Sequence, residues 1–268
     1  MNHEFWIKQT IDKPLFPELL WSRPENRQQA GKLLIVGGNS WGFAAPALAY
    51  DEAVKAGIGA ARVLLPAAVH KVIGHAMEHA ESATSTPSGS FSQQALAELL
   101  EQASWSDGVL VAGDLGRNSE TAILLEKFLN TFTGQVSLTK DAVDYAINFS
   151  DLILNRTQTT LILSMGQLQK LATAAHFDQA LTSSMDLIRL VDTLHTFTEK
   201  FPISLVVKHY QNIVITTKGQ VSTTKLIEER PIWRVSTAAH IATWWLQNSS
   251  KSFEAMTTAA IAMQSQSE

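Results

Sequence analysis

Short apolar runs alternate with longer stretches of helical spacing along most of the chain. Runs such as Leu33–Val36 end at glycine or polar residues, which is typical of strands buried on both faces of a parallel sheet. The predicted strands are Leu33–Val36, Ala61–Leu65, Gly108–Val111, Gln135–Leu138, Thr160–Leu163, Leu205–Lys208, Asn212–Thr217 and Val221–Lys225. The predicted helices are Pro46–Ala56, Ala67–His79, Gln93–Ala103, Ser119–Leu129, Gln167–Ala174, Phe177–Lys200, Ser236–Gln247 and Lys251–Gln264.

The order of these elements predicts a doubly wound α/β fold. Strands and helices alternate through most of the chain, and such alternation places helices on both faces of a mostly parallel sheet. The last two strands flank Lys218-Gly219-Gln220, the pattern of a β-hairpin, so we expect an antiparallel edge. We expect an irregular N-terminal arm over residues 1–30, a single domain over residues 31–268 and a surface loop over Glu81–Ser92.

Composition excludes several classes of function. The chain has 268 residues, 45% of them hydrophobic, and a formal net charge of −4. It lacks the basic surface that nucleic-acid binding requires, so we expect no nucleic-acid partner. No apolar run has the length of a membrane span and no Lys/Arg cluster indicates an anchor, so we expect no membrane partner. The absence of cysteine and of a signal peptide is typical of a cytoplasmic protein, and we also expect a homo-oligomer.

A glycine turn follows the first predicted strand. Gly37-Gly38-Asn39-Ser40 precedes a helix, and backbone N–H groups at such a turn can hold an anion that the helix dipole also favours. Asn39 or Ser40 can cap the helix. The alternative is a tight connection without a ligand, because neither the phosphate loop nor the dinucleotide fingerprint is present.

A second glycine segment, Gly113-Asp114-Leu115-Gly116-Arg117, follows a later strand. With the first turn, it resembles two blocks of the ADP- or ATP-dependent NAD(P)H-hydrate dehydratases, a family with a ribokinase-like fold. That family has Gly-Gly-Ser and a Tyr in its first block, and Gly-Pro-Gly-Leu-Gly-Arg in its second. This chain has Phe43 at the Tyr position, and its second block is one residue shorter, with Asp114 in place of Pro-Gly.

Three later blocks agree more weakly with the family. Leu-Asp-Ala-Asp-Ala-Leu corresponds to Leu138–Val143, in which Thr139 replaces the first Asp. His-Pro-Gly-Glu corresponds to Ser164–Gln167, and Leu-Lys-Gly corresponds to a strand end that keeps Lys208. The order of the blocks implies the ribokinase-like fold over most of the chain.

The resemblance implies a substrate site and a nucleotide site at the carboxyl ends of the strands. The implied substrate-binding residues are Gly37, Gly38, Asn39, Ser40 and Phe43. The implied nucleotide-binding residues are Gly113, Asp114, Gly116, Arg117 and Lys208. ATP or ADP with Mg²⁺ is the implied cofactor. Phe43 lacks the hydroxyl of Tyr and Asp114 adds negative charge, so both changes weaken binding of the family's own substrate.

The block that carries the family's chemistry is missing. The family opens a long helix with Gly-Thr-Gly-Asp, whose N–H groups hold the transferring phosphate and whose Asp takes the proton from the attacking hydroxyl. The matching region, Trp233–His240, has no glycine, and no Asp occurs from Pro231 to Glu268. We therefore predict no catalytic residue and a degenerate family member that binds a nucleotide or a protein without turnover.

The sequence leaves two other interpretations open. An active dehydratase or a small-molecule kinase would need a relocated base, for which Glu228, Glu229 and His240 are available. Separately, His75, Glu78 and His79 match the H-x-x-E-H pattern of inverted zinc peptidases. No further acidic ligand has a convincing spacing, so we interpret this segment as the polar face of a surface helix and predict no metal site.

Overall fold

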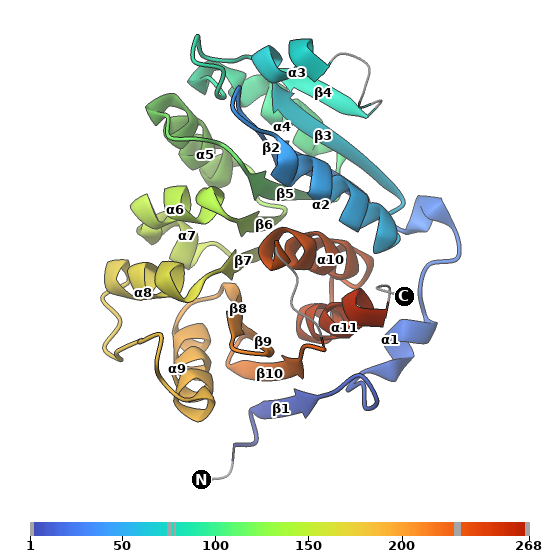
Figure 1. The fold of residues 1–268 in the computed structure, drawn as a ribbon, viewed down its shortest axis with the longest axis vertical. Helices are drawn as coiled ribbons and strands as arrows, with labels where there is room; N and C mark the ends of the chain where they lie inside the picture. The colour runs from blue at the N-terminus through green and yellow to red at the C-terminus, as the bar shows by residue number, and fades with distance from the viewer. Residues whose placement is uncertain (1–2, 74–76, 78, 228–231, 266–268) are drawn as a thin grey trace.

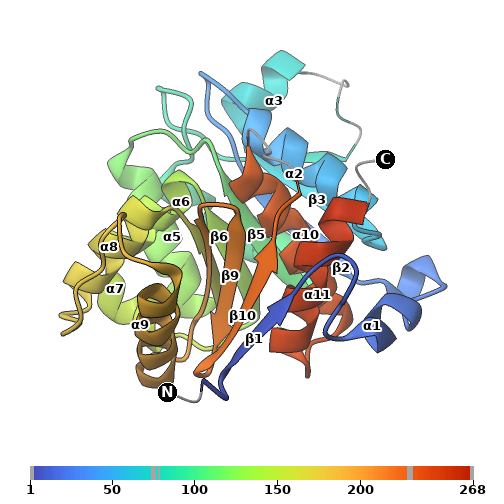
Figure 2. The same cartoon turned by 60° about the horizontal axis from the view of Figure 1, so that its bottom comes forward.

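The computed structural model describes residues 3–73, 77, 79–227 and 232–265. Within these residues a 10-stranded sheet of order β1-β10-β9-β8-β7-β6-β5-β2-β3-β4 separates two layers of helices (Figures 1 and 2). The strands are β1 Trp6–Gln9, β2 Lys32–Gly37, β3 Ala60–Pro66, β4 Ala80–Ala83, β5 Gly108–Gly113, β6 Gln135–Thr139, β7 Thr159–Leu163, β8 Ser204–His209, β9 Asn212–Thr217 and β10 Gln220–Lys225. The helices are α1 Pro17–Trp21, α2 Ala44–Lys55, α3 Ala67–Ile73, α4 Leu96–Trp105, α5 Ser119–Thr131, α6 Asp141–Asn148, α7 Ser150–Asn155, α8 Met165–Ala174, α9 Leu187–Lys200, α10 Trp233–Gln247 and α11 Ser252–Ser265.

The sheet is parallel from β8 to β4 and changes direction at the hairpin. β8 pairs antiparallel with β9, and β9 pairs antiparallel with β10. The predicted doubly wound, mostly parallel sheet with an antiparallel hairpin is therefore confirmed. The hairpin is not the outermost element, because β1 pairs in parallel with β10 outside it.

Successive residues of β2 face opposite layers of helices. Leu34 and Val36 pack into the cluster formed with α4 to α9, whereas Leu33 and Ile35 pack into the cluster formed with α2, α10 and α11. All four side chains are buried. A strand covered on both faces needs an uninterrupted apolar run, which is why the sequence pattern located the central strands correctly.

Two edge strands were missed by the sequence prediction. β1 lies within the arm that was expected to be irregular, where Trp6 Nε1 donates a hydrogen bond to Thr223 Oγ1 at 3.1 Å. β4 covers the beginning of the loop predicted over Glu81–Ser92 and pairs with β3. An edge strand contacts the sheet on one side only and needs no apolar run, so its position depends on partners that are distant in the sequence.

The predicted helix Phe177–Lys200 is shorter in the structure. It begins at Leu187 as α9, with Asp186 as the N-cap residue. The Asp186 side chain accepts a hydrogen bond from Arg189 N at 2.9 Å. A carboxylate that satisfies a free N–H group of the first turn fixes the beginning of the helix at this residue.

The helix predicted over Ala67–His79 also differs from the helix in the structure. α3 covers its residues up to Ile73, and His79 lies in a turn before β4. His75 and Glu78 of the zinc-peptidase pattern lie outside the described residues. Over the described part of the chain, no helix has both the length and the apolar character needed to cross a membrane.

A buried contact between Glu52 and His240 joins α2 to α10 on one face of the sheet. Glu52 Oε2 lies 3.3 Å from His240 Nε2, and the two residues are 4% and 1% exposed. Lys55 Nζ also lies 2.7 Å from Glu52 Oε1. The hydrogen bond to His240, and secondarily Lys55, lowers the pKa of Glu52 from 4.5 to about 2 against the opposing effect of burial.

This lowered pKa predicts a pH dependence of folding stability. The Glu52 contribution is present above pH 4.5, the ordinary pKa, and is lost as the pH falls toward about 2. We expect Glu52→Gln to lower the free energy of unfolding at neutral pH by about 3 kcal/mol, because one partner of a buried pair is removed. Urea denaturation between neutral and acidic pH measures both effects. The exposed Glu101→Gln is the control, and an unchanged acid dependence in Glu52→Gln would contradict the assignment.

Candidate functional site

The carboxyl ends of the parallel strands meet at one edge of the sheet, as a doubly wound topology requires. The two predicted glycine segments follow β2 and β5, which are paired, and Gly38 N donates to Gly113 O at 3.0 Å. A side chain at Gly37 would collide with the same carbonyl oxygen. Glycine is therefore needed for the close approach of the two loops. Lys208 lies near the end of β8, separated from β5 by β7 and β6, so it is not brought together with the glycine segments.

The residues from Asn39 to Phe43 form a closed turn. Asn39 N and Gly42 N each donate to the carbonyl of the other residue, at 2.9 and 3.0 Å. Ser40 N donates at 3.0 Å to a carbonyl of the loop that follows β4. The prediction that Asn39 or Ser40 caps α2 is wrong, because Phe43 occupies the N-cap position and its side chain accepts no hydrogen bond. The turn presents Trp41 to solvent with 93% of its surface exposed.

Asp114 supplies the missing cap from the end of β5. Its Oδ2 accepts a hydrogen bond from Ala45 N in the first turn of α2 at 2.7 Å. Its Oδ1 forms an ion pair with Lys140 Nζ. Asp114 and Lys140 both have positive φ angles, 57° and 53°, a conformation that costs roughly 1–3 kcal/mol for a residue with a side chain. The Asp114 carboxylate thus occupies the position where an external anion would meet the N-terminus of α2.

A second carboxylate, Asp141, binds the backbone of the other glycine segment. Asp141 Oδ2 accepts hydrogen bonds from Leu115 N at 2.8 Å and from Gly116 N at 3.1 Å. Burial raises the pKa of Asp141, and these two hydrogen bonds oppose the shift only in part. The N–H group of Gly116, one of the residues that the resemblance assigns to nucleotide binding, is therefore bound by a side chain of the protein itself.

Gln167 connects α6, α8 and α10 at the same edge. Its Nε2 donates to Lys140 O at 2.7 Å and to Asp144 Oδ2 at 2.8 Å. Its Oε1 accepts from Arg234 Nη1 at 3.0 Å. The family has a Glu at the Gln167 position and a Gly-Thr-Gly-Asp turn near Arg234. Here a neutral amide and a cation take their places.

His240, one of the three residues suggested as a relocated base, already makes a buried contact. His240 lies within α10, where it is buried and paired with Glu52 between two helices. Glu228 and Glu229 lie outside the described residues.

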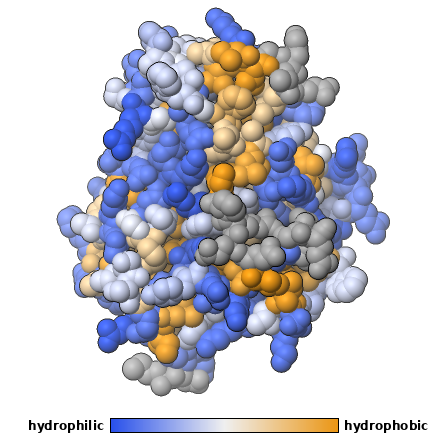
Figure 3. Space-filling model, in the orientation of Figure 1, coloured by the Kyte–Doolittle hydropathy of each residue, from blue (hydrophilic) through white to orange (hydrophobic). Residues whose placement is uncertain are grey.

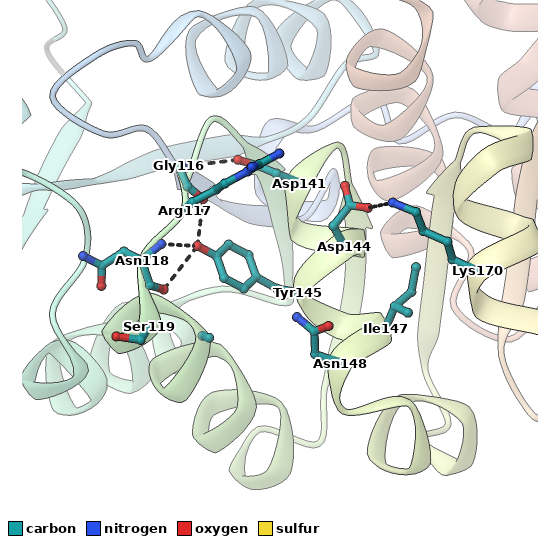
Figure 4. Close-up of a pocket in the computed structure, with 11 residues that line it drawn as sticks. Gly116, Arg117, Asn118, Ser119, Asp141, Asp144, Tyr145, Ile147, Asn148 and Lys170 are labelled. Atoms are coloured by element: carbon teal, nitrogen blue, oxygen red, sulfur yellow. Dashed lines mark hydrogen bonds and ion pairs between the residues drawn. The ribbon is translucent and has the colours of Figure 1, made fainter. Parts of the chain in front are cut away.

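A pocket with a volume of about 580 Å³ opens between the start of α5 and one face of α6 (Figure 4). Of the predicted site residues, Gly116 and Arg117 line it. Sequence reasoning missed Tyr145, Asn148 and Lys170, which also line it. Tyr145 and Asn148 follow Asp141 at helical spacing, but this signal is readable only once α6 is recognised as a helix.

Tyr145 fixes the loop that forms one wall of this pocket. Its hydroxyl donates to Gly116 O at 2.7 Å and accepts from Asn118 N at 2.8 Å. Burial raises the pKa of Tyr145, so the hydroxyl stays protonated and can donate. Figure 4 shows these contacts as dashed lines beside the phenol ring. These two hydrogen bonds tie the loop between β5 and α5 to α6.

Comparison with known proteins gives similarity at the level of fold. No protein-family model matches the chain, and no curated protein matches it. A ribokinase-like superfamily protein from Enterococcus faecalis aligns at 13% identity and a TM-score of 0.74, over 98% of this chain and 87% of that one. ADP/ATP-dependent NAD(P)H-hydrate dehydratase from Bacillus subtilis, co-crystallised with ATP and Mg²⁺, aligns at 13% identity and a TM-score of 0.65, over 94% and 87%. Adenosine kinase from Anopheles gambiae aligns at 8% identity and a TM-score of 0.52, over 96% and 90%.

These neighbours establish that the chain has the ribokinase-like fold that the sequence blocks implied. The individual substrate-binding and nucleotide-binding residues stay predictions, because similarity at this level of identity extends to the fold alone.

Removing the Tyr145 hydroxyl tests its role in holding the loop. We expect Tyr145→Phe to lower the free energy of unfolding by about 1–2 kcal/mol, because Gly116 O and Asn118 N each lose a hydrogen-bond partner. Urea denaturation at neutral pH gives this value. Tyr210→Phe is the matched control, since Tyr210 is 70% exposed. Equal stability of the two variants would show that the hydroxyl does not hold the loop.

Proposed function

We propose that this chain is a nucleotide-binding protein of the ribokinase-like fold that does not catalyse phosphoryl transfer or dehydration of hydrated NAD(P)H. The support for nucleotide binding is the fold, together with a solved neighbour described as ADP/ATP-dependent and co-crystallised with ATP and Mg²⁺. The pocket beside α5 and α6 has the size of a small-molecule site.

One observation supports the proposed absence of turnover. Carboxylates of the chain already bind the backbone N–H groups that could hold a phosphate. Asp114 binds the N-terminus of α2, and Asp141 binds two N–H groups after β5. A transferring phosphate would have to displace these charges or approach them closely, and either event raises the energy of the transition state. The missing Asp in the last helical region removes the general base as well.

The residues at this edge do not fit Mg²⁺. The Asp114 carboxylate is neutralised by Lys140, and Gln167 offers a neutral amide beside the Arg234 guanidinium. Mg²⁺ prefers carboxylate, phosphate and water oxygens in an octahedral arrangement and is repelled by neighbouring cations. No step of the proposed function uses the metal.

One feature of Asp141 favours a second candidate function, that of an active enzyme. This carboxyl group lines the pocket and has a raised pKa through burial. A carboxylate with a raised pKa is a stronger proton acceptor than an ordinary one, and Asp141 Oδ1 has no hydrogen-bond partner within the described part of the chain. An active small-molecule kinase or dehydratase would then use Asp141 as its relocated base.

One assay separates the two functions. The protein is incubated with hydrated NADH and either ATP or ADP, and the recovery of NADH absorbance is followed. We expect no enzyme-like turnover, because the base and the phosphate-binding turn are both absent from the last helical region. We also expect nucleotides to raise the melting temperature by mass action. Turnover that disappears in Asp141→Asn would establish the second function instead.

Replacing Asp114 by Asn should favour nucleotide phosphates, because it removes a negative charge and leaves the Lys140 cation without its ion-pair partner. We expect Asp114→Asn to tighten ATP binding roughly threefold to tenfold, and AMP binding by less, because repulsion grows with ligand charge. The amide keeps an oxygen to accept from Ala45 N, so the cap of α2 is preserved. Isothermal titration calorimetry at low and high salt measures the effect, which should shrink with salt. Asp12→Asn, an exposed site in the loop after β1, is the control, and equal tightening there would reject a local effect.

A further inference from the structure

We infer that the pocket between α5 and α6 binds a nucleoside monophosphate, with its single phosphate at Arg117 and its base at Asn148. This inference rests on the proposed function and adds the ligand class and its orientation. It places the nucleotide in the layer of helices α4 to α9, on the opposite face of the sheet from α2 and α10.

The dimensions and walls of the pocket suit a small, flat ligand. Its volume is about 580 Å³, within the range of ligand pockets in proteins. The Tyr145 ring, Ile147 and Ala122 give it an apolar surface. In Figure 4, the Tyr145 ring lies between Arg117 at one end and Asn148 at the other. A heteroaromatic ring can pack on this surface, since base stacking on an aromatic side chain is favourable for every base.

The charges around the pocket limit the ligand to one phosphate group. Asp144 is paired with Lys170 at 3.4 Å, and Asp141 is used by the backbone of the glycine segment. Among the described residues, Arg117 has no hydrogen-bond or ion-pair partner, so its guanidinium is the cation available to a ligand. A di- or triphosphate would bring additional negative charge toward Asp141 and Asp144. The other cation that lines the pocket, Lys170, is already paired with Asp144 and so does not offset that charge.

Arg117 can hold a phosphate in a bidentate manner, because its planar guanidinium presents parallel N–H donors. The Tyr145 hydroxyl holds the carbonyl of Gly116, the residue before Arg117. The backbone of Arg117 is therefore in place before a phosphate binds. Preorganisation of this kind lowers the entropy cost of binding.

At the other end, the Asn148 amide has no hydrogen-bond partner among the described residues. An amide both donates and accepts, which matches the paired donor and acceptor groups along the edge of a nucleobase. The pocket therefore offers a cation for the phosphate at one end, and a flat apolar wall and an amide for the face and the edge of the base.

Fragment binding tests the two ends separately. Calorimetry measures the affinity of AMP, ADP, ATP, adenosine and ribose 5-phosphate for the wild type, Arg117→Gln and Asn148→Ala. We expect AMP to bind more tightly than ADP or ATP. Arg117→Gln should weaken AMP and ribose 5-phosphate by at least about tenfold and leave adenosine unchanged, because it removes charge-assisted hydrogen bonds. Asn148→Ala should weaken AMP and adenosine and leave ribose 5-phosphate unchanged.

Two control variants match these changes elsewhere on the molecule. Arg189→Gln removes an exposed arginine of α9, and Asn130→Ala removes an exposed asparagine at the far end of α5. Failure of every nucleotide to bind the wild type would overturn the proposed function. Two results would overturn the inference about this pocket while nucleotide binding itself stands. The first is binding of ADP or ATP at least tenfold more tightly than AMP. The second is nucleotide binding that neither Arg117→Gln nor Asn148→Ala changes.

Discussion

The edge of the sheet where the candidate site lies depends on the two contacts of the Asp114 carboxylate. It joins the end of β5 to the N-terminus of α2 and to Lys140 after β6. The Lys140 carbonyl in turn accepts from Gln167, which binds Arg234 in the first turn of α10. One chain of contacts thus positions the ends of two strands and the beginnings of α2, α8 and α10. Its cost is a positive φ angle at both Asp114 and Lys140.

The Asp114, Lys140, Gln167 and Arg234 side chains have partners within the protein, whereas Asp141 Oδ1 is buried without a hydrogen-bond partner among the residues that the structure describes. A polar network whose members already have partners loses those interactions when a ligand enters, so an added phosphate at α2 has an opposing energy to overcome. The pocket of α5 and α6 lies beside the network and shares Asp141 with it. Arg117, which lines this pocket, has no hydrogen-bond or ion-pair partner among the described residues. A ligand at Arg117 would therefore displace no protein contact of that side chain, unlike a phosphate at the N-terminus of α2.

The central sheet was predictable from the sequence, whereas the site was predictable only in part. Strands such as Leu33–Val36 are apolar on both faces, and this local pattern survives in the fold. The negative charge of Asp114 was recognised, but its contact with Ala45 depends on the φ angle of a shortened loop. α6 covers two turns, too few for helical spacing to stand out, so Tyr145 and Asn148 were missed with it. β1 depends on partners more than 200 residues away, which no local pattern reports.

The fold and the chemistry of a ribokinase-like protein are held by different residues, and α10 illustrates why one can change without the other. The body of this helix is fixed by buried apolar side chains and by the pair of His240 with Glu52. Its end is fixed by Gln247, whose Nε2 donates to Ala30 O and Gly57 O at 3.2 and 2.9 Å. In the first turn, Val235 also belongs to this core, whereas Arg234 contacts Gln167 at the edge of the sheet. Arg234 can therefore vary while the buried contacts that hold the helix are kept, so the fold alone does not determine the chemistry of this turn.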